Sequence, residues 1–146
     1  MQLPRLVTLF GYAGLIPFFV GPAWLNFSPA SIPDWMDAVW LSYCALIAAF
    51  MAGSLWGFAL PACEGAAGRA GLLIAIALMP LAWISTALPL TPALAVLALC
   101  FVLLLAADFW REQTLGTVGG YFALRLTLTL GVLVAMGWRY AISAGA

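Results

Sequence analysis

Arg125 points most directly to binding chemistry, because it lies about five residues inside a long apolar run. A charged side chain at the centre of a bilayer costs roughly 2.5–3.5 kcal/mol on insertion scales, so an arginine there must face protein or reach towards the surface. Asp108, at the end of the preceding apolar run, is expected on the same side, where it can pair with Arg125; Glu112 is the alternative partner. An ion pair would hold two helices together, whereas the functional alternative is a site for an anion or a lipid headgroup.

Four other residues could contribute to a polar or aromatic site. Tyr121 and Thr129 stand one helical turn before and after Arg125, so they share its helix face. Trp56 and Trp83 fall inside apolar runs rather than between them. They are expected either to pack against other helices or to line a cavity for a flat apolar ligand.

Catalytic chemistry is disfavoured by the residue types that the chain lacks. It contains no histidine and no lysine, which removes the commonest general base and metal ligand as well as a serine–lysine dyad. The widely spaced cysteines Cys44, Cys63 and Cys100 have no metal-ligand spacing and no activating base. We therefore expect no catalytic, cofactor-binding or metal-binding residues and lean against an enzyme.

The elements that position these residues are long apolar runs. Of 146 residues, 66% are hydrophobic and 7% charged, whereas a soluble domain has about 25% charged residues. A run of about 20 apolar residues spans a hydrocarbon core of about 30 Å as a helix. The sequence predicts an all-α membrane protein, a single transmembrane domain over residues 1–146 built as a bundle of five transmembrane helices, with a polar loop over residues 108–119. The expected spans are residues 6–25, 38–60, 70–88, 92–109 and 120–142.

Small residues recur at every fourth position of the second predicted span, at Ala45, Ala49, Gly53 and Gly57. Such a stripe lets two helix backbones approach closely. We expect it to pack against another helix of the same chain; a dimer interface or a ligand groove is the alternative.

Charge and aromatic residues indicate the environment and the orientation. The lipid bilayer is the expected partner, with a membrane protein or a second copy as further possibilities, and zero net charge argues against nucleic acid. Positively charged residues are more frequent on the cytoplasmic side of a membrane protein. If the N-terminus is cytoplasmic, Arg139 is the one arginine expected outside, so the arginines predict this orientation. The arginines expected inside are Arg5, Arg69 and Arg111, and the tryptophans expected at the outer surface are Trp35, Trp40 and Trp138.

Several short motifs follow one another in an order that resembles a known family. They are Gly11-Tyr12-Ala13-Gly14-Leu15-Ile16-Pro17-Phe18, Trp56-Gly57, Pro80 followed by Trp83, Asp108, and Leu124-Arg125-Leu126-Thr127-Leu128-Thr129. The sequence resembles the bacterial and mitochondrial family numbered 3429 among domains of unknown function, which includes eukaryotic transmembrane protein 69. The resemblance implies a multi-pass membrane protein and supplies no activity. The N-terminus lacks an Arg- and Ser-rich transit segment, so we expect the cytoplasmic (inner) membrane of a bacterium.

Two functional hypotheses follow from these observations. The first is a non-enzymatic membrane protein with a structural or accessory role, in which the pair between Arg125 and Asp108 holds helices together. The alternative is a ligand-binding or small-molecule transport protein with a cavity between helices, lined by tryptophan and arginine side chains.

Overall fold

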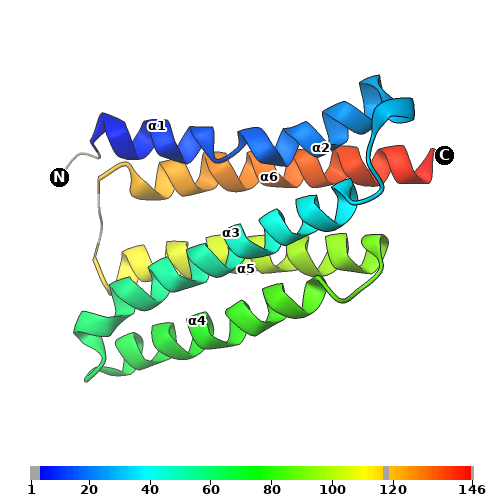
Figure 1. Ribbon diagram of the computed structural model, residues 1–146. Helices are drawn as coiled ribbons and strands as arrows, with labels where there is room; N and C mark the ends of the chain where they lie inside the picture. The colour runs from blue at the N-terminus through cyan, green and yellow to red at the C-terminus, as the bar shows by residue number, and fades with distance from the viewer. Residues whose placement is uncertain (1–3, 117–118, 146) are drawn as a thin grey trace.

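A computed structural model describes residues 4–116 and 119–145, and its architecture is all-α (Figure 1). Within these residues, five helical stretches are long and apolar enough to cross a bilayer, as predicted. The first is formed by two consecutive helices, α1 and α2. The helices are α1 (Arg5–Ala13), α2 (Ile16–Phe27), α3 (Met36–Ala59), α4 (Ala66–Ser85), α5 (Leu90–Thr114) and α6 (Tyr121–Ala144), with short 3₁₀ turns η1 (Pro29–Ser31) and η2 (Leu60–Ala62).

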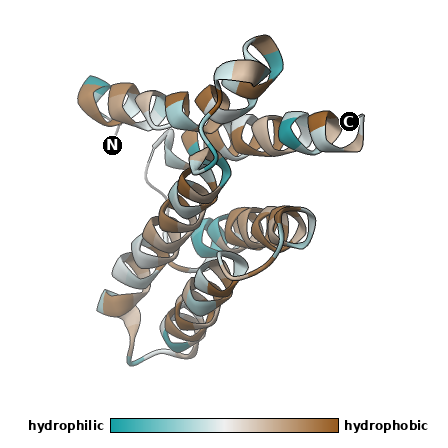
Figure 2. Ribbon diagram, turned by 45° about the vertical axis from the view of Figure 1, so that its right-hand side comes forward, coloured by the Kyte–Doolittle hydropathy of each residue, from teal (hydrophilic) through white to brown (hydrophobic). Residues whose placement is uncertain are grey.

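The outer surface of the bundle is apolar, as a lipid environment requires. Phe50 and Trp83 are 73% and 72% exposed, and large aliphatic side chains such as Leu46 and Val134 also face outwards. Hydrophobic residues cover most of the length of every long helix (Figure 2). Because a water-soluble protein of this size rarely exposes apolar patches beyond a few hundred Å², this surface is consistent with burial in hydrocarbon.

The helices pack in two groups. Helices α3, α4 and α5 contact one another, and the chain of α1 and α2 lies along α6, with α2 also contacting α3 (Figures 1 and 2). Helix α5 contacts α6 and so joins the groups. The two termini lie at opposite ends of the bundle, as an odd number of crossings requires.

The first span, expected as one run over residues 6–25, is broken between α1 and α2 at Gly14 and Leu15. Pro17 lies in the first turn of α2, where its missing N–H and fixed φ suit the start of a helix. The break leaves the Gly14 carbonyl outside the helical pattern, and the Tyr43 hydroxyl of α3 donates a hydrogen bond to it at 2.7 Å. A backbone break at membrane depth is tolerated when a neighbouring helix satisfies the freed group.

The contact between α2 and α3 is built in the same way around Trp40. Pro22 in α2 has no N–H, so the carbonyl of Phe18 loses its helical donor. The Trp40 Nε1–H donates to that carbonyl at 2.9 Å. A Cβ on Gly21 would lie 2.7 Å from the Trp40 ring, so only glycine allows this approach. Trp40, which is predicted at the outer membrane surface, lies near the start of α3, and α2 covers its side chain, which is 4% exposed.

Helix α5 continues beyond the predicted end of the fourth span. The expected loop over residues 108–119 is wrong for its first part, because the helix runs to Thr114 and includes Asp108 and Arg111. These two residues lie three positions apart on one helix face, where opposite charges compensate each other. Helix α6 then starts after Gly120, whose φ of 77° lies in the left-handed region that glycine adopts without strain.

The small-residue stripe on α3 does not pack against another helix along its whole length. Ala45 is buried, but Gly53 and Gly57 face outwards, with no described atom within 4 Å of a Cβ built on either. The expected packing role of Ala49, Gly53 and Gly57 is therefore wrong for both glycines. The close approach between α3 and α4 instead involves Gly71, where an added Cβ would lie 2.8 Å from the Ala59 Cβ.

Candidate functional site

The structure brings Arg125, Asp108 and Tyr121 together between α5 and α6. Arg125 Nη2 lies 2.7 Å from Asp108 Oδ2, and their side chains are 6% and 1% exposed. Arg125 Nη1 donates a 2.7 Å hydrogen bond to the Tyr121 hydroxyl, one helical turn earlier on α6. Two charges that would be costly in hydrocarbon thus face each other inside the protein. Glu112, the alternative partner, is half-buried and makes no ion pair among residues 4–116 and 119–145.

A second arginine, Arg111, belongs to the same cluster and was expected in a cytoplasmic loop. Its side chain is 1% exposed, and its Nε lies 3.7 Å from Asp108 Oδ1. Its Nη1 donates to the Gly116 carbonyl at 3.1 Å, and its guanidinium lies 4.2 Å above the Phe58 ring, a cation–π contact. The signal for this residue was its spacing of three from Asp108, which places both on one face if the helix continues.

The cluster of Asp108, Arg111, Arg125 and Tyr121, called here the charge cluster, holds more positive than negative charge. Two guanidinium groups share one carboxylate, so one positive charge is in excess when all three are ionised. Within the described part of the chain, Arg125 Nε, Arg111 Nε and Nη2, and Asp108 Oδ2 are buried without a hydrogen-bond partner. The contact between Arg125 Nη2 and Asp108 Oδ2 is therefore an ion pair, but the two groups are not aligned as a hydrogen bond requires. Buried guanidinium donors without acceptors favour a further anionic or polar group at this position.

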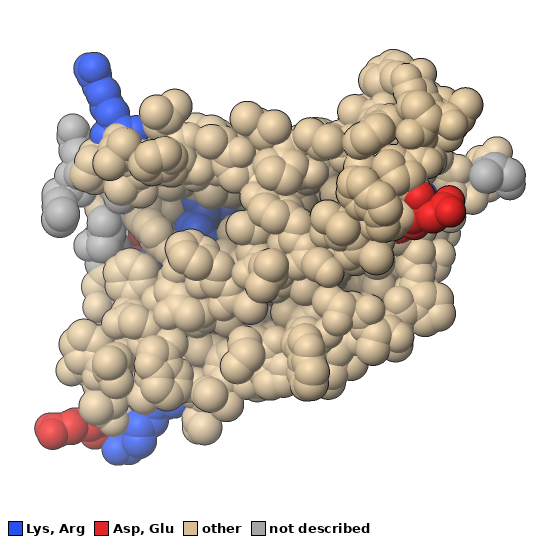
Figure 3. All heavy atoms as spheres, viewed as in Figure 1, with Lys and Arg blue, Asp and Glu red and all other residues tan. Residues whose placement is uncertain are grey.

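A cavity of about 470 Å³ adjoins the charge cluster. It lies between the first span, α3 and α6, and its polar side chains are Ser54, Tyr121 and Arg125. The other lining residues are apolar or glycine, among them Phe10, Phe50 and Val132. Basic atoms are visible at the bottom of a hollow between α1 and α3 (Figure 3). The volume falls within the range of about 300–1,000 Å³ that small-molecule sites occupy.

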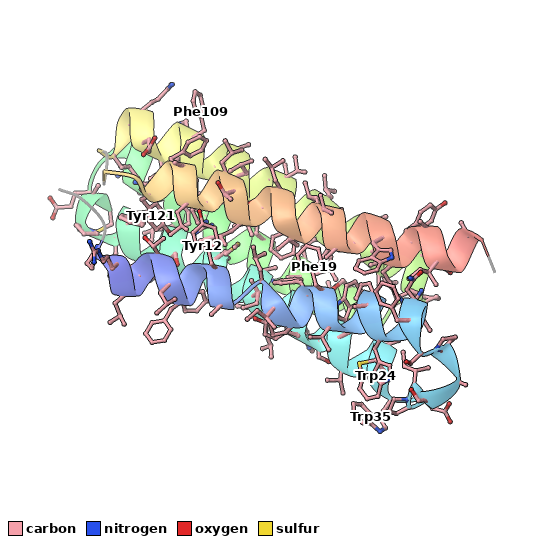
Figure 4. The ribbon with its side chains drawn as sticks, turned by 90° about the horizontal axis from the view of Figure 1, so that it is seen from above. Tyr12, Phe19, Trp24, Trp35, Phe109 and Tyr121 are labelled. Atoms are coloured by element: carbon pink, nitrogen blue, oxygen red, sulfur yellow. The ribbon has the colours of Figure 1, made fainter. Side chains whose placement is uncertain are left out.

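The cavity has a polar end and an apolar end. Its α6 residues run from Tyr121 to Val132, which covers about 16 Å at a rise of 1.5 Å per residue. Tyr121 and Arg125 lie at the end of the bundle where α1 begins, and Val132 lies deeper. Tyr121 points in among the helices, whereas Phe109 points away from them (Figure 4). The lining residues of α3, from Ile47 to Ser54, belong to the same half of the bundle.

The remaining predicted site residues do not line this cavity. Trp56 and Trp83 are 39% and 72% exposed and face outwards, so the expected tryptophan lining is wrong. Thr129 is buried on α6 one turn beyond Arg125, outside the lining. In the described ranges 4–116 and 119–145, no three of the side chains Cys, Asp and Glu gather as metal ligands would. The arrangement therefore offers an apolar cavity with one cationic end.

Among the described residues, five helical stretches of membrane length and the charge cluster between two of them define a multi-pass membrane protein of the lipid bilayer. The chain belongs to the family described as "Protein of unknown function (DUF3429)", whose model matches residues 3–141. The expected family resemblance is thereby confirmed. The chain has no match among curated proteins and none among solved structures.

Proposed function

We propose that this protein binds an amphipathic membrane molecule in the cavity between the first span, α3 and α6. The observation that carries the proposal is the composition of the cavity wall: an apolar lining with polar groups at one end, at Ser54, Tyr121 and Arg125. Ligand sites have this character, with few polar groups fixing the orientation of an otherwise apolar contact.

The position of the cavity supports entry from the bilayer. The hollow opens on the side of the bundle, between α1 and α3 (Figure 3), on a molecule whose surface exposes many large hydrophobic side chains. None of the side chains of α1, from Arg5 to Ala13, is buried, so this wall of the cavity is one helix thick. An apolar molecule in the surrounding lipid can therefore reach the cavity without crossing water.

We also propose that the pair between Asp108 and Arg125 is structural and joins α5 to α6 whether or not a ligand is present. Its burial and the 2.7 Å contact support this role. Ligand binding and helix attachment are compatible, because Asp108 does not line the cavity whereas Arg125 does.

Filling the cavity from α3 is expected to weaken binding without disturbing the charge cluster. In the Ser54→Phe variant the added ring enters the cavity, because Ser54 lines it. We expect binding of oleic acid and of oleyl alcohol to weaken by at least about tenfold, measured by titration of purified protein in detergent. Native mass spectrometry should likewise record less co-purified lipid.

The matched control is Ser42→Phe, the same change on the exposed surface of α3 outside the cavity lining. It should bind both probes as the wild type does. Equal binding by wild type and Ser54→Phe, or no binding of either probe to wild type, would contradict the proposed cavity.

We propose further that the chain lies in a bacterial cytoplasmic membrane with the α1 end of the bundle facing the cytoplasm. Arg5 and Arg69 belong to this end. Arg139, on α6, lies at the other end, where it pairs with Asp37 in the first turn of α3. Figure 3 shows basic atoms at the end that holds the N-terminus. This distribution supports the orientation through the preference of arginine for the cytoplasmic side.

A native thiol can test this orientation. Cys63 is exposed between α3 and α4, at the α1 end, whereas Cys44 and Cys100 are fully buried. A membrane-impermeant maleimide should label Cys63 in inverted vesicles and leave it unlabelled in spheroplasts. A Cys63→Ser, Ala30→Cys variant, with the thiol in η1 at the opposite end, should give the reverse pattern. Labelling of Cys63 from outside would overturn the orientation.

A further inference from the structure

We infer that the amphiphile carries an anionic group, a carboxylate or a phosphate, and that this group binds at the charge cluster. The inference rests on the proposed function and specifies its ligand class. The first support is the charge excess: Arg111 and Arg125, both more than nine-tenths buried, face the single carboxylate of Asp108. A buried excess charge strongly favours the binding of a group of opposite charge, because little water is present to screen their attraction.

The second support is the hydrogen-bonding state of Tyr121, which lines the cavity. Its hydroxyl oxygen accepts a hydrogen bond from Arg125 Nη1 at 2.7 Å. A tyrosine hydroxyl that accepts in this way keeps its own proton for donation. An anionic oxygen in the cavity would accept that proton's hydrogen bond while lying next to the Arg125 guanidinium.

The third support is the direction of the cavity. Its polar end lies at the first two turns of α6 and its apolar end at Val132, near the middle of the span. A bound molecule would hold its anionic group near the membrane surface and its chain towards the centre. This is the direction of the lipids around the protein, so entry from the side requires no inversion of the molecule.

The anionic ends of a free fatty acid and of a phospholipid share this chemistry. A carboxylate on one chain, a phosphate on one chain and a phosphate on two chains can all approach Tyr121 and Arg125. The sources differ in the anionic group and in the number of chains, and the experiment below separates both.

The test compares probes that differ in their end group. Purified wild-type protein in neutral detergent is titrated with oleic acid, with oleyl alcohol of the same chain length, and with single-chain and two-chain phosphatidic acids, at a pH where the acids are ionised. We expect oleic acid to bind at least about tenfold more tightly than oleyl alcohol. Preference for oleic acid or for a phosphatidic acid identifies the source, the single-chain and two-chain forms separate the number of chains, and each of these results supports the inference.

Tyr121→Phe supplies the variant test, because it keeps the ring and removes the hydroxyl. It should reduce the preference for oleic acid over oleyl alcohol by about tenfold, because the acid loses more affinity than the alcohol does. Arg125→Gln should do the same if it folds, and its thermal unfolding is measured alongside. Equal affinity of wild type for acid and alcohol would overturn the anionic group and leave the cavity standing. Failure of both probes to bind would overturn the cavity itself.

Discussion

Replacing Asp108 with asparagine is expected to lower the free energy of unfolding by about 3–5 kcal/mol, the usual cost of breaking a buried ion pair by removing one partner. The side chains of Asp108 and Arg111 are each 1% exposed, and that of Arg125 is 6% exposed. Without the carboxylate, two guanidinium groups would repel each other where water cannot solvate them. Thermal unfolding in detergent, followed by circular dichroism, measures the loss.

The same substitution at Asp37 is the matched control. Asp37 pairs with Arg139 through two contacts, at 3.0 and 2.8 Å, but its side chain is 47% exposed. Exposed pairs contribute up to about 1 kcal/mol, so Asp37→Asn should be mild. Arg125→Leu should fall between the two, because Asp108 would keep Arg111 as a partner. Wild-type stability of Asp108→Asn and of Arg125→Leu would rule out a structural role for the pair.

Trp40→Phe is expected to cost about 1–3 kcal/mol, the penalty for leaving a buried polar group without a partner. The phenylalanine ring keeps much of the packing but cannot donate to the Phe18 carbonyl, which Pro22 leaves without a helical donor. The measurement is again unfolding in detergent. Trp35→Phe, the same change at a 57% exposed position, should have little effect.

A double-mutant cycle separates the hydrogen bond from the packing of the ring. In Pro22→Ala, the alanine N–H can donate to the Phe18 carbonyl within α2. The Trp40→Phe substitution should then cost about 1 kcal/mol less than in the wild-type background. An equal cost in both backgrounds would show that the indole N–H contributes nothing, and that ring packing accounts for the whole effect.

The number and nature of the spans could be predicted from sequence, because the length of an apolar run and the thickness of a bilayer are directly comparable. Whether a given residue faces another helix or the lipid could not be predicted as well. Trp40 is near the start of α3, as expected for an interfacial tryptophan, yet α2 folds over it because Gly21 allows close approach. Gly53 and Gly57 form a recognisable motif, but the motif does not specify whether another helix covers it.

The charge cluster was half predictable for a physical reason. A lone arginine inside an apolar run requires a partner, and Asp108, at the end of the preceding run, is expected on the same side. The sequence predicts a loop at Arg111, because a run of polar residues usually ends a span, whereas in the structure Asp108 and Arg111 neutralise each other and the helix continues. A cavity lined by arginine is one of the hypotheses that the sequence supports, but the position of the cavity and its apolar wall could not be predicted. The wall combines residues from three separate spans, and the opening lies next to α1, where the first span is broken.

The cavity occupies one half of the bundle: its lining comes from the first half of α6, the second half of α3, and α1 with the start of α2. A side opening confined in this way meets only one monolayer of the membrane. Under the proposed function, the occupancy of the site would follow the composition of that monolayer, and a ligand delivered to the opposite monolayer would first have to flip across. The proposed site would thus make the protein sensitive to a difference in lipid composition between the two monolayers.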